Sequence, residues 1–155
     1  MVQLAIEGNP RFRLCDLELR RPAPSYSVET VEHFLRRYAS QDLFFILGTD
    51  AFAEISSWRD YRRLLSMCNF AVVSRPGWPC EELQRLIPAE VASQFEAREG
   101  AWVHRQEGVR LLPVRVTELG IAASAIRSLV RRGRSIRYLV PPAVERYIWS
   151  RGLYR

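Results

Sequence analysis

The sequence predicts an α/β fold built on a doubly wound parallel sheet. Short apolar runs alternate along the chain with stretches whose apolar residues recur at helical spacing. This alternation is typical of parallel strands joined by crossover helices. The apolar run at residues 43–47 also ends abruptly at Gly48-Thr49-Asp50, and ligands in open α/β sheets bind outside the carboxyl ends of strands. We therefore expect a nucleotide near Gly48 and Asp50.

A second ligand signal lies downstream, at Ser124-Ala-Ile-Arg127. It places a serine at a predicted helix start and an arginine one turn later, and the N–H groups of a helix N-terminus bind anions. Together with Gly48 and Asp50, this pattern indicates an enzyme that acts on nucleotides.

Four stretches have the composition of strands: residues 12–19, 43–47, 69–74 and 109–116. The first alternates between apolar and polar side chains, whereas the run at residues 43–47 has the apolar continuity of a strand buried on both faces. Arg75-Pro-Gly is a turn signal that ends the third strand. Residues 96–108 are polar and predict a loop.

Helix signals occupy the remaining stretches: residues 1–7, a helix starting at Ser27, a helix capped by Ser57 and Asp60, residues 81–95 with a break at Pro88, residues 124–132 and residues 141–151. The helix after Ser27 is predicted because Val28, Val31 and Phe34 lie on one helical face. The last two helices are each followed by a glycine, which is typical of helix ends.

Composition narrows the function only modestly. The net charge of +6 suits a nucleic-acid partner. However, all 23 basic residues are arginine, which indicates biased codon usage. The charge is therefore weak evidence for a polyanionic partner. Cys15, Cys68 and Cys80 have no metal-like spacing, and we expect Cys15 and Cys68 to be buried thiols of a reducing cytoplasm. No apolar stretch is as long as a membrane span, so we expect no membrane association.

Residues 1–7 have the pattern of the back half of a helix. A doubly wound domain ordinarily opens with a strand and its phosphate-binding turn. We therefore expect a single domain over residues 1–155 that is incomplete at its N-terminus, with about one βα unit missing.

Several segments in this order resemble bacterial nicotinate-nucleotide adenylyltransferases, of the wider HxGH nucleotidyltransferase superfamily: Met1-Val-Gln-Leu-Ala-Ile, Ser25-Tyr-Ser27 with Thr30, Gly48-Thr-Asp50 with Trp58, Arg75-Pro-Gly77, Ser124-Ala-Ile-Arg127 and Tyr147-Ile148 to Gly152-Leu-Tyr154. The resemblance implies a Rossmann-like nucleotidyltransferase fold. It also implies transfer of an adenylyl group from ATP to nicotinate mononucleotide, with Mg²⁺ accompanying ATP.

The sequence departs from that family at one central motif. G-x-F-D-P-x-H-x-G-H is absent from these 155 residues, and the two histidines, His33 and His104, lie in other settings. We expect both to be surface residues and the chain alone to be inactive. Ala122 also stands where the family usually has a serine, which leaves Ser124 and Arg127 in place.

The resemblance implies two groups of site residues. Gly48, Asp50, Ser124 and Arg127 would bind ATP: Asp50 would accept hydrogen bonds from ribose hydroxyls, and Arg127 would act catalytically on the triphosphate. Structural alternatives exist for some of these residues: Gly48 and Asp50 can form a plain strand-to-loop turn in which Asp50 caps a helix, and Arg127 can be a surface residue of an arginine-rich helix.

The second group would bind nicotinate mononucleotide. Trp58 would stack on the pyridine ring, the backbone at Tyr26 and Ser27 would face its carboxylate, and Arg75 would lie near the same substrate. The alternatives are core packing for Trp58, helix capping for Ser27 and a solvated turn for Arg75.

Other functions stay open. A truncated, non-catalytic nucleotide-binding relative fits the missing motif, and an adenylyltransferase for another phosphate, such as that of pantetheine, fits the remaining residues. A basic nucleic-acid-binding domain is disfavoured because no basic stripe is interleaved with aromatics. The sequence leaves open whether the protein is a homo-oligomer.

Overall fold

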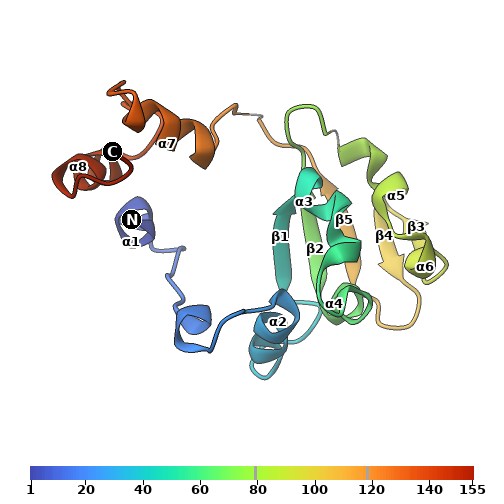
Figure 1. The fold of residues 1–155 in the computed structure, drawn as a ribbon. Coiled ribbons are helices and arrows are strands. Elements are labelled where there is room, and N and C mark those ends of the chain that lie inside the picture. Colours follow the sequence, from blue (N-terminus) through green and yellow to red (C-terminus); the bar gives the residue numbers. More distant parts are fainter. Residues whose placement is uncertain (79, 118) are drawn as a thin grey trace. The chain divides into compact units, whose positions relative to one another are not determined.

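The computed structural model describes residues 1–78, 80–117 and 119–155. Two compact units form within them, and Figure 1 shows both. The larger comprises Leu17–Glu118, and the smaller combines Met1–Asp16 with Leu119–Arg155. We describe each unit by itself.

The larger unit contains a five-stranded sheet in the order β1-β2-β5-β4-β3 (Figure 1). The strands are β1 (Phe44–Gly48), β2 (Asn69–Val73), β3 (Phe95–Arg98), β4 (Ala101–His104) and β5 (Arg110–Val114). Strands β1, β2 and β5 are parallel, whereas β3 and β4 form an antiparallel hairpin that continues the sheet from β5. The predicted α/β fold is confirmed, and strands β1, β2 and β5 form the predicted parallel sheet.

The side chain of Asn69 connects the parallel strands at their amino-terminal ends. This buried side chain donates from Nδ2 to the carbonyl oxygen of Gln41 at 2.8 Å. Its Oδ1 accepts the N–H of Arg110 at 2.9 Å. One amide therefore links the starts of β1, β2 and β5, and their carboxyl ends lie together at the opposite edge of the sheet.

Helices of the larger unit cover the sheet with apolar faces: α2 (Ser27–Leu35), α3 (Thr49–Ala53), α4 (Tyr61–Met67), α5 (Leu83–Leu86) and α6 (Ala89–Ala92), with 3-10 turns η1 (Leu17–Arg20), η2 (Ile55–Ser57) and η3 (Cys80–Glu82). Phe52, Leu64, Phe70 and Val72 are fully buried in its core. On the other face of β1, Ile46 is 71% exposed, so the expected burial of this strand on both faces is wrong.

The smaller unit contains α1 (Val2–Ile6), α7 (Ala123–Arg131) and α8 (Pro142–Ser150). Leu4 of α1 packs against a core that includes Ile126 and Ile148. Gly133 and Gly152 follow α7 and α8 with φ of 64° and 60°, as expected of glycines that end helices. The helices predicted at both ends of the chain are confirmed.

Two predicted elements are wrong. Residues 12–19 form no strand: Phe12 and Leu14 are exposed, and so is Cys15, which was expected to be buried. The predicted loop at residues 96–108 contains most of the β3–β4 hairpin, whose turn residues Glu99 and Gly100 both have positive φ. Two successive residues of positive φ are typical of tight hairpin turns.

Candidate active site at the carboxyl edge of the sheet

Two of the polar residues predicted from sequence, Asp50 and Arg75, meet where two parallel strands end. Gly48, the last residue of β1, is paired in register with Val73, the last residue of β2. The segments that follow these strands therefore begin side by side. The first carries Asp50 and the second carries Arg75.

Position 48 requires glycine because neighbouring side chains approach its backbone closely. Its φ of −75° and ψ of 156° are open to other residues. A Cβ at this position would, however, collide with Oδ1 of Asp50 and lie 3.0 Å from Cγ and 3.2 Å from Cδ of Arg75. The side chains of Asp50 and Arg75 therefore lie across the space that glycine leaves open.

Asp50 and Arg75 also face each other. Nε of Arg75 lies 3.6 Å from Oδ2 of Asp50, and both side chains are nearly half exposed. Oδ1 of Asp50 accepts the N–H of Ala51 at 2.9 Å. Three of the residues predicted from sequence are thus brought together, and the carboxylate retains an exposed surface for a ligand hydroxyl.

The turn that carries Arg75 is held by a residue that sequence reasoning did not assign. Thr49 is fully buried, and its hydroxyl donates to the carbonyl oxygen of Trp78 at 2.7 Å. Trp78 also exchanges two backbone hydrogen bonds with Arg75. A buried threonine in a Gly-Thr-Asp sequence gives no signal of its distant partner.

Trp58 and Tyr26 belong to a second group in the same unit. Trp58 follows η2, three residues before α4 begins, and its half-buried ring packs edge-to-face on Phe45 with the centroids 6.0 Å apart. The ring of Tyr26 packs against the core beneath the guanidinium of Arg59, which lies 4.5 Å from its centroid. Arg59 was not predicted, and its proximity to Tyr26 depends on the fold.

Helix α2 begins differently from the prediction. Tyr26 is its N-cap and Ser27 its first residue, and no side chain caps the helix within the described part of the chain. The same holds at the predicted cap of α4: Asp60 is the N-cap, in a left-handed conformation, without a side-chain hydrogen bond. The N–H groups at the start of α2 are therefore not capped by any described side chain.

Ser124 and Arg127 lie in the smaller unit, as the second and fifth residues of α7. Both are exposed. The N-cap is Ala122, which provides no capping hydroxyl. The helix begins one residue before the predicted start, so Ser124 lies in its first turn and Arg127 at the beginning of its second.

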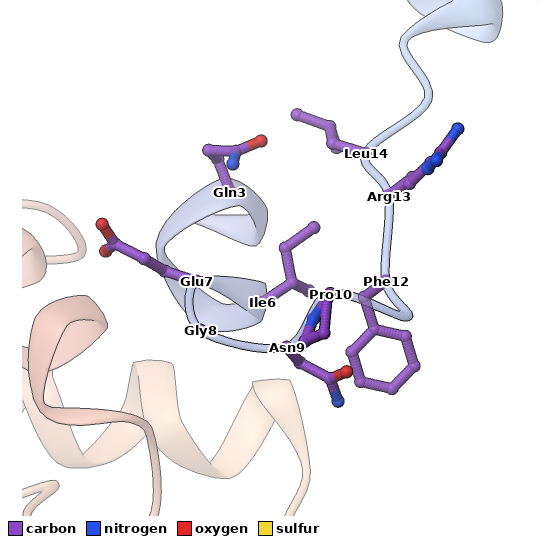
Figure 2. A pocket seen from close by; sticks show the side chains of 9 residues that line it. All are labelled: Gln3, Ile6, Glu7, Gly8, Asn9, Pro10, Phe12, Arg13 and Leu14. Carbon is purple, nitrogen blue, oxygen red and sulfur yellow. The ribbon is translucent and has the colours of Figure 1, made fainter.

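Two of the surface cavities illustrate that concave surface also lies outside these groups. The first, of about 650 Å³, is lined by Ile6, Pro10, Phe12 and neighbours in residues 3–14 (Figure 2). The second, of about 440 Å³, includes His104. This histidine is 5% exposed, and its Nδ1 accepts the N–H of Glu107, so its expected surface position is wrong, whereas His33 is exposed as expected. Neither cavity contains a predicted site residue among its described lining.

Burial also decides the chemistry of two cysteines. It raises the pKa of the Cys68 thiol to about 12, and it raises the pKa of the Cys80 thiol. Neither sulfur is therefore a ready nucleophile.

The described residues contain no cluster of three or more metal-ligating side chains. None of the described helices is long and apolar enough to cross a bilayer.

Comparisons with known proteins show the family to which the chain belongs. Residues 1–129 match the family described as Cytidylyltransferase-like. A protein of Syntrophotalea carbinolica named "Probable nicotinate-nucleotide adenylyltransferase" is 43% identical over 156 residues, covering 100% of this chain and 72% of the relative. The chain belongs to the nicotinate-nucleotide adenylyltransferase family. Another member, from Geotalea uraniireducens, is 43% identical, with 99% of this chain and 72% of the relative covered.

Solved structures agree on the fold. Plasmodium falciparum nicotinic acid mononucleotide adenylyltransferase complexed with APC matches with a TM-score of 0.53 and 17% identity, over 87% of this chain and 60% of that protein. The same enzyme complexed with NaAD matches with a TM-score of 0.56 and 15% identity, over 84% and 58%. The chain thus spans about three fifths of these structures, which support the Rossmann-like nucleotidyltransferase fold.

Proposed function

We propose that this chain serves the transfer of an adenylyl group from ATP to nicotinate mononucleotide, giving deamido-NAD and pyrophosphate. The observation that carries the proposal is the Gly48, Asp50 and Arg75 cluster at the carboxyl edge of the parallel strands. It occurs in a chain that shares 43% identity with a named member of the family. Glycine, carboxylate and guanidinium at this edge suit a nucleotide ligand.

The reaction needs no covalent intermediate with the protein. A phosphate oxygen of the mononucleotide attacks the α-phosphorus of ATP, forming a new P–O bond. The bond from the α-phosphorus to the bridging oxygen breaks, and pyrophosphate leaves with that electron pair. The protein contributes positioning and positive charge for such a transfer.

The ATP residues have separate tasks. Asp50 accepts hydrogen bonds from ribose hydroxyls, and Gly48 allows the sugar to approach the backbone. Arg127 meets the triphosphate and, as the catalytic arginine, stabilises charge that develops there. Ser124 and the N–H groups of the first turn of α7 add donors.

The mononucleotide residues are Arg75, Trp58, Tyr26 and Ser27. Arg75 attracts the phosphate, and the exposed part of Trp58 stacks on the pyridine ring. The backbone N–H groups at the start of α2 receive the nicotinate carboxylate, since no described side chain caps them. Carboxylate recognition of this kind favours nicotinate over an uncharged analogue.

Mg²⁺ enters with ATP. Mg²⁺ is commonly held by substrate phosphates and water, with few protein carboxylates. When bound, the ion neutralises phosphate charge.

The three free cysteines agree with a cytoplasmic protein. The proposed reaction requires neither a nucleic acid nor a membrane.

Ligand titration of the 155-residue chain tests the proposal. We expect nicotinate mononucleotide to bind by calorimetry with a dissociation constant below about 1 mM, the usual range for enzyme substrates. Asp50→Asn should weaken ATP binding, and Arg75→Gln should weaken mononucleotide binding. Preference for phosphopantetheine would indicate another adenylyltransferase, and tight binding of single-stranded DNA without either nucleotide would overturn the proposal.

A further inference from the structure

Thr49 connects the segments that follow β1 and β2 at the candidate site. It is the first residue of α3, directly after Gly48, and it is fully buried. Its hydroxyl donates to the carbonyl oxygen of Trp78 at 2.7 Å, across 29 positions of sequence. The hydrogen bond therefore attaches the segment after β2 to the segment after β1.

That carbonyl belongs to a closed turn. The N–H of Arg75 donates to the oxygen of Trp78 at 3.2 Å, and the N–H of Trp78 donates to the oxygen of Arg75 at 2.8 Å. These two bonds close the turn on itself but do not attach it to its neighbours. Ser74, directly before Arg75, attaches the start of the turn to the end of β5 by donating its N–H to the carbonyl oxygen of Val114 at 3.0 Å. The Thr49 hydroxyl attaches the other end of the turn, at Trp78, to the start of α3.

The position of Arg75 is therefore coupled to Thr49. The stem of Arg75 lies across Gly48, and its Nε lies 3.6 Å from Oδ2 of Asp50. We infer that Thr49 is a positioning residue, whose hydroxyl holds the Arg75–Trp78 turn so that the guanidinium is presented beside Asp50. This inference rests on the proposed function for the role of Arg75 toward the mononucleotide.

The hold on the turn is tested without a ligand. Thr49→Val removes the hydroxyl at constant volume, and the Trp78 oxygen retains the Arg75 N–H. We expect the amide protons of Arg75 and Trp78 to exchange about fivefold faster by NMR, corresponding to the loss of one net hydrogen bond. Thr49→Ala should do the same, whereas Thr49→Ser should restore protection. Ser66→Ala, which removes the hydroxyl that donates to the Arg63 oxygen within α4, is the matched control.

The link to Arg75 is tested by a double-mutant cycle. We expect Thr49→Val to weaken mononucleotide binding roughly fivefold and ATP binding much less. In an Arg75→Gln background, Thr49→Val should have no further effect. Equal weakening in both backgrounds, or unchanged exchange of the two amides, would overturn the inference. Failure of the unmodified chain to bind the mononucleotide would instead refute the proposed function, while amide exchange still decides the role of Thr49.

Discussion

Replacing Gly48 with alanine tests the candidate site at its closest contact. The backbone of Gly48 is extended, with φ of −75°, so alanine introduces no conformational strain. The new methyl group would collide with Oδ1 of Asp50 and lie 3.0 Å from Cγ of Arg75. Both neighbours are flexible side chains, so they would move while the strand stays in place.

The two consequences differ in size. Displacing Asp50 breaks its hydrogen bond to the N–H of Ala51, which costs about 1 kcal/mol of stability. Loosening the half-exposed pair with Arg75 adds about 0–1 kcal/mol, and alanine returns about 0.4–1 kcal/mol by restricting the unfolded chain. A carboxylate that no longer reaches a ribose hydroxyl loses about 1.5–3 kcal/mol of binding, or roughly 10- to 100-fold in ATP affinity.

Calorimetric titration with ATP and chemical unfolding measure these two quantities on the same protein. Gly120→Ala is the matched control, because a Cβ there would meet nothing within 4 Å and its φ is not positive. We expect Gly48→Ala to retain its fold and lose ATP affinity, and Gly120→Ala to retain both. An unchanged ATP affinity for Gly48→Ala would refute the assignment, and a loss of more than about 3 kcal/mol in stability would refute the argument that only flexible atoms move.

Four further predictions concern other groups. Trp58→Ala should weaken mononucleotide binding far more than ATP binding in paired titrations, because stacking is lost on one ligand only; equal effects would leave Trp58 a core residue. Arg127→Ala should weaken ATP binding, and Arg127→Lys should not restore it fully, since a point charge does not replace a planar fork of donors; full restoration would exclude a bidentate contact. Near pH 8, a thiol reagent should label exposed Cys15 first and leave Cys68 unlabelled until unfolding, because burial raises the pKa of Cys68 to about 12; mass spectrometry of the labelled protein checks the order. The 155-residue chain should release pyrophosphate from ATP and nicotinate mononucleotide at a turnover rate far below about 1 s⁻¹, because its sequence lacks the G-x-F-D-P-x-H-x-G-H motif. Turnover at that rate would show that these 155 residues catalyse the transfer without the motif.

The sequence predicts the elements that bury a regular apolar pattern. Strand β2 and helix α2 are examples: Phe70 and Val72 alternate on one face of the strand, and Val28 and Val31 lie on one face of the helix. Strand β3 is not predicted because half of its residues are charged and half are exposed. Its best local signal is the Glu99-Gly100 turn. The false strand at residues 12–19 shows the converse, since alternation predicts a strand only where a partner strand is available.

The site residues likewise divide into those that the sequence predicts and those that depend on the fold. Gly48 and Asp50 are found from sequence because they directly follow an apolar strand. Their partner Arg75 is 25 positions beyond Asp50, and the pairing depends on the register that sets Gly48 opposite Val73. The Thr49–Trp78 hydrogen bond depends on the same register. Sequence reasoning therefore nominates the groups that carry charge, whereas the groups that orient them follow from strand alignment.

The Asp50–Arg75 pair also affects how a ligand reaches Gly48. In this structure the stem of Arg75 and the carboxylate of Asp50 occupy the space above the glycine. A pair this exposed contributes about 0–1 kcal/mol, which is less than one charged hydrogen bond from a bound nucleotide provides. A nucleotide can therefore displace the pair at little cost, and each partner then exchanges a weak mutual contact for one to the ligand. The Thr49 link limits that movement to the side chain of Arg75, because the turn from which it departs stays attached.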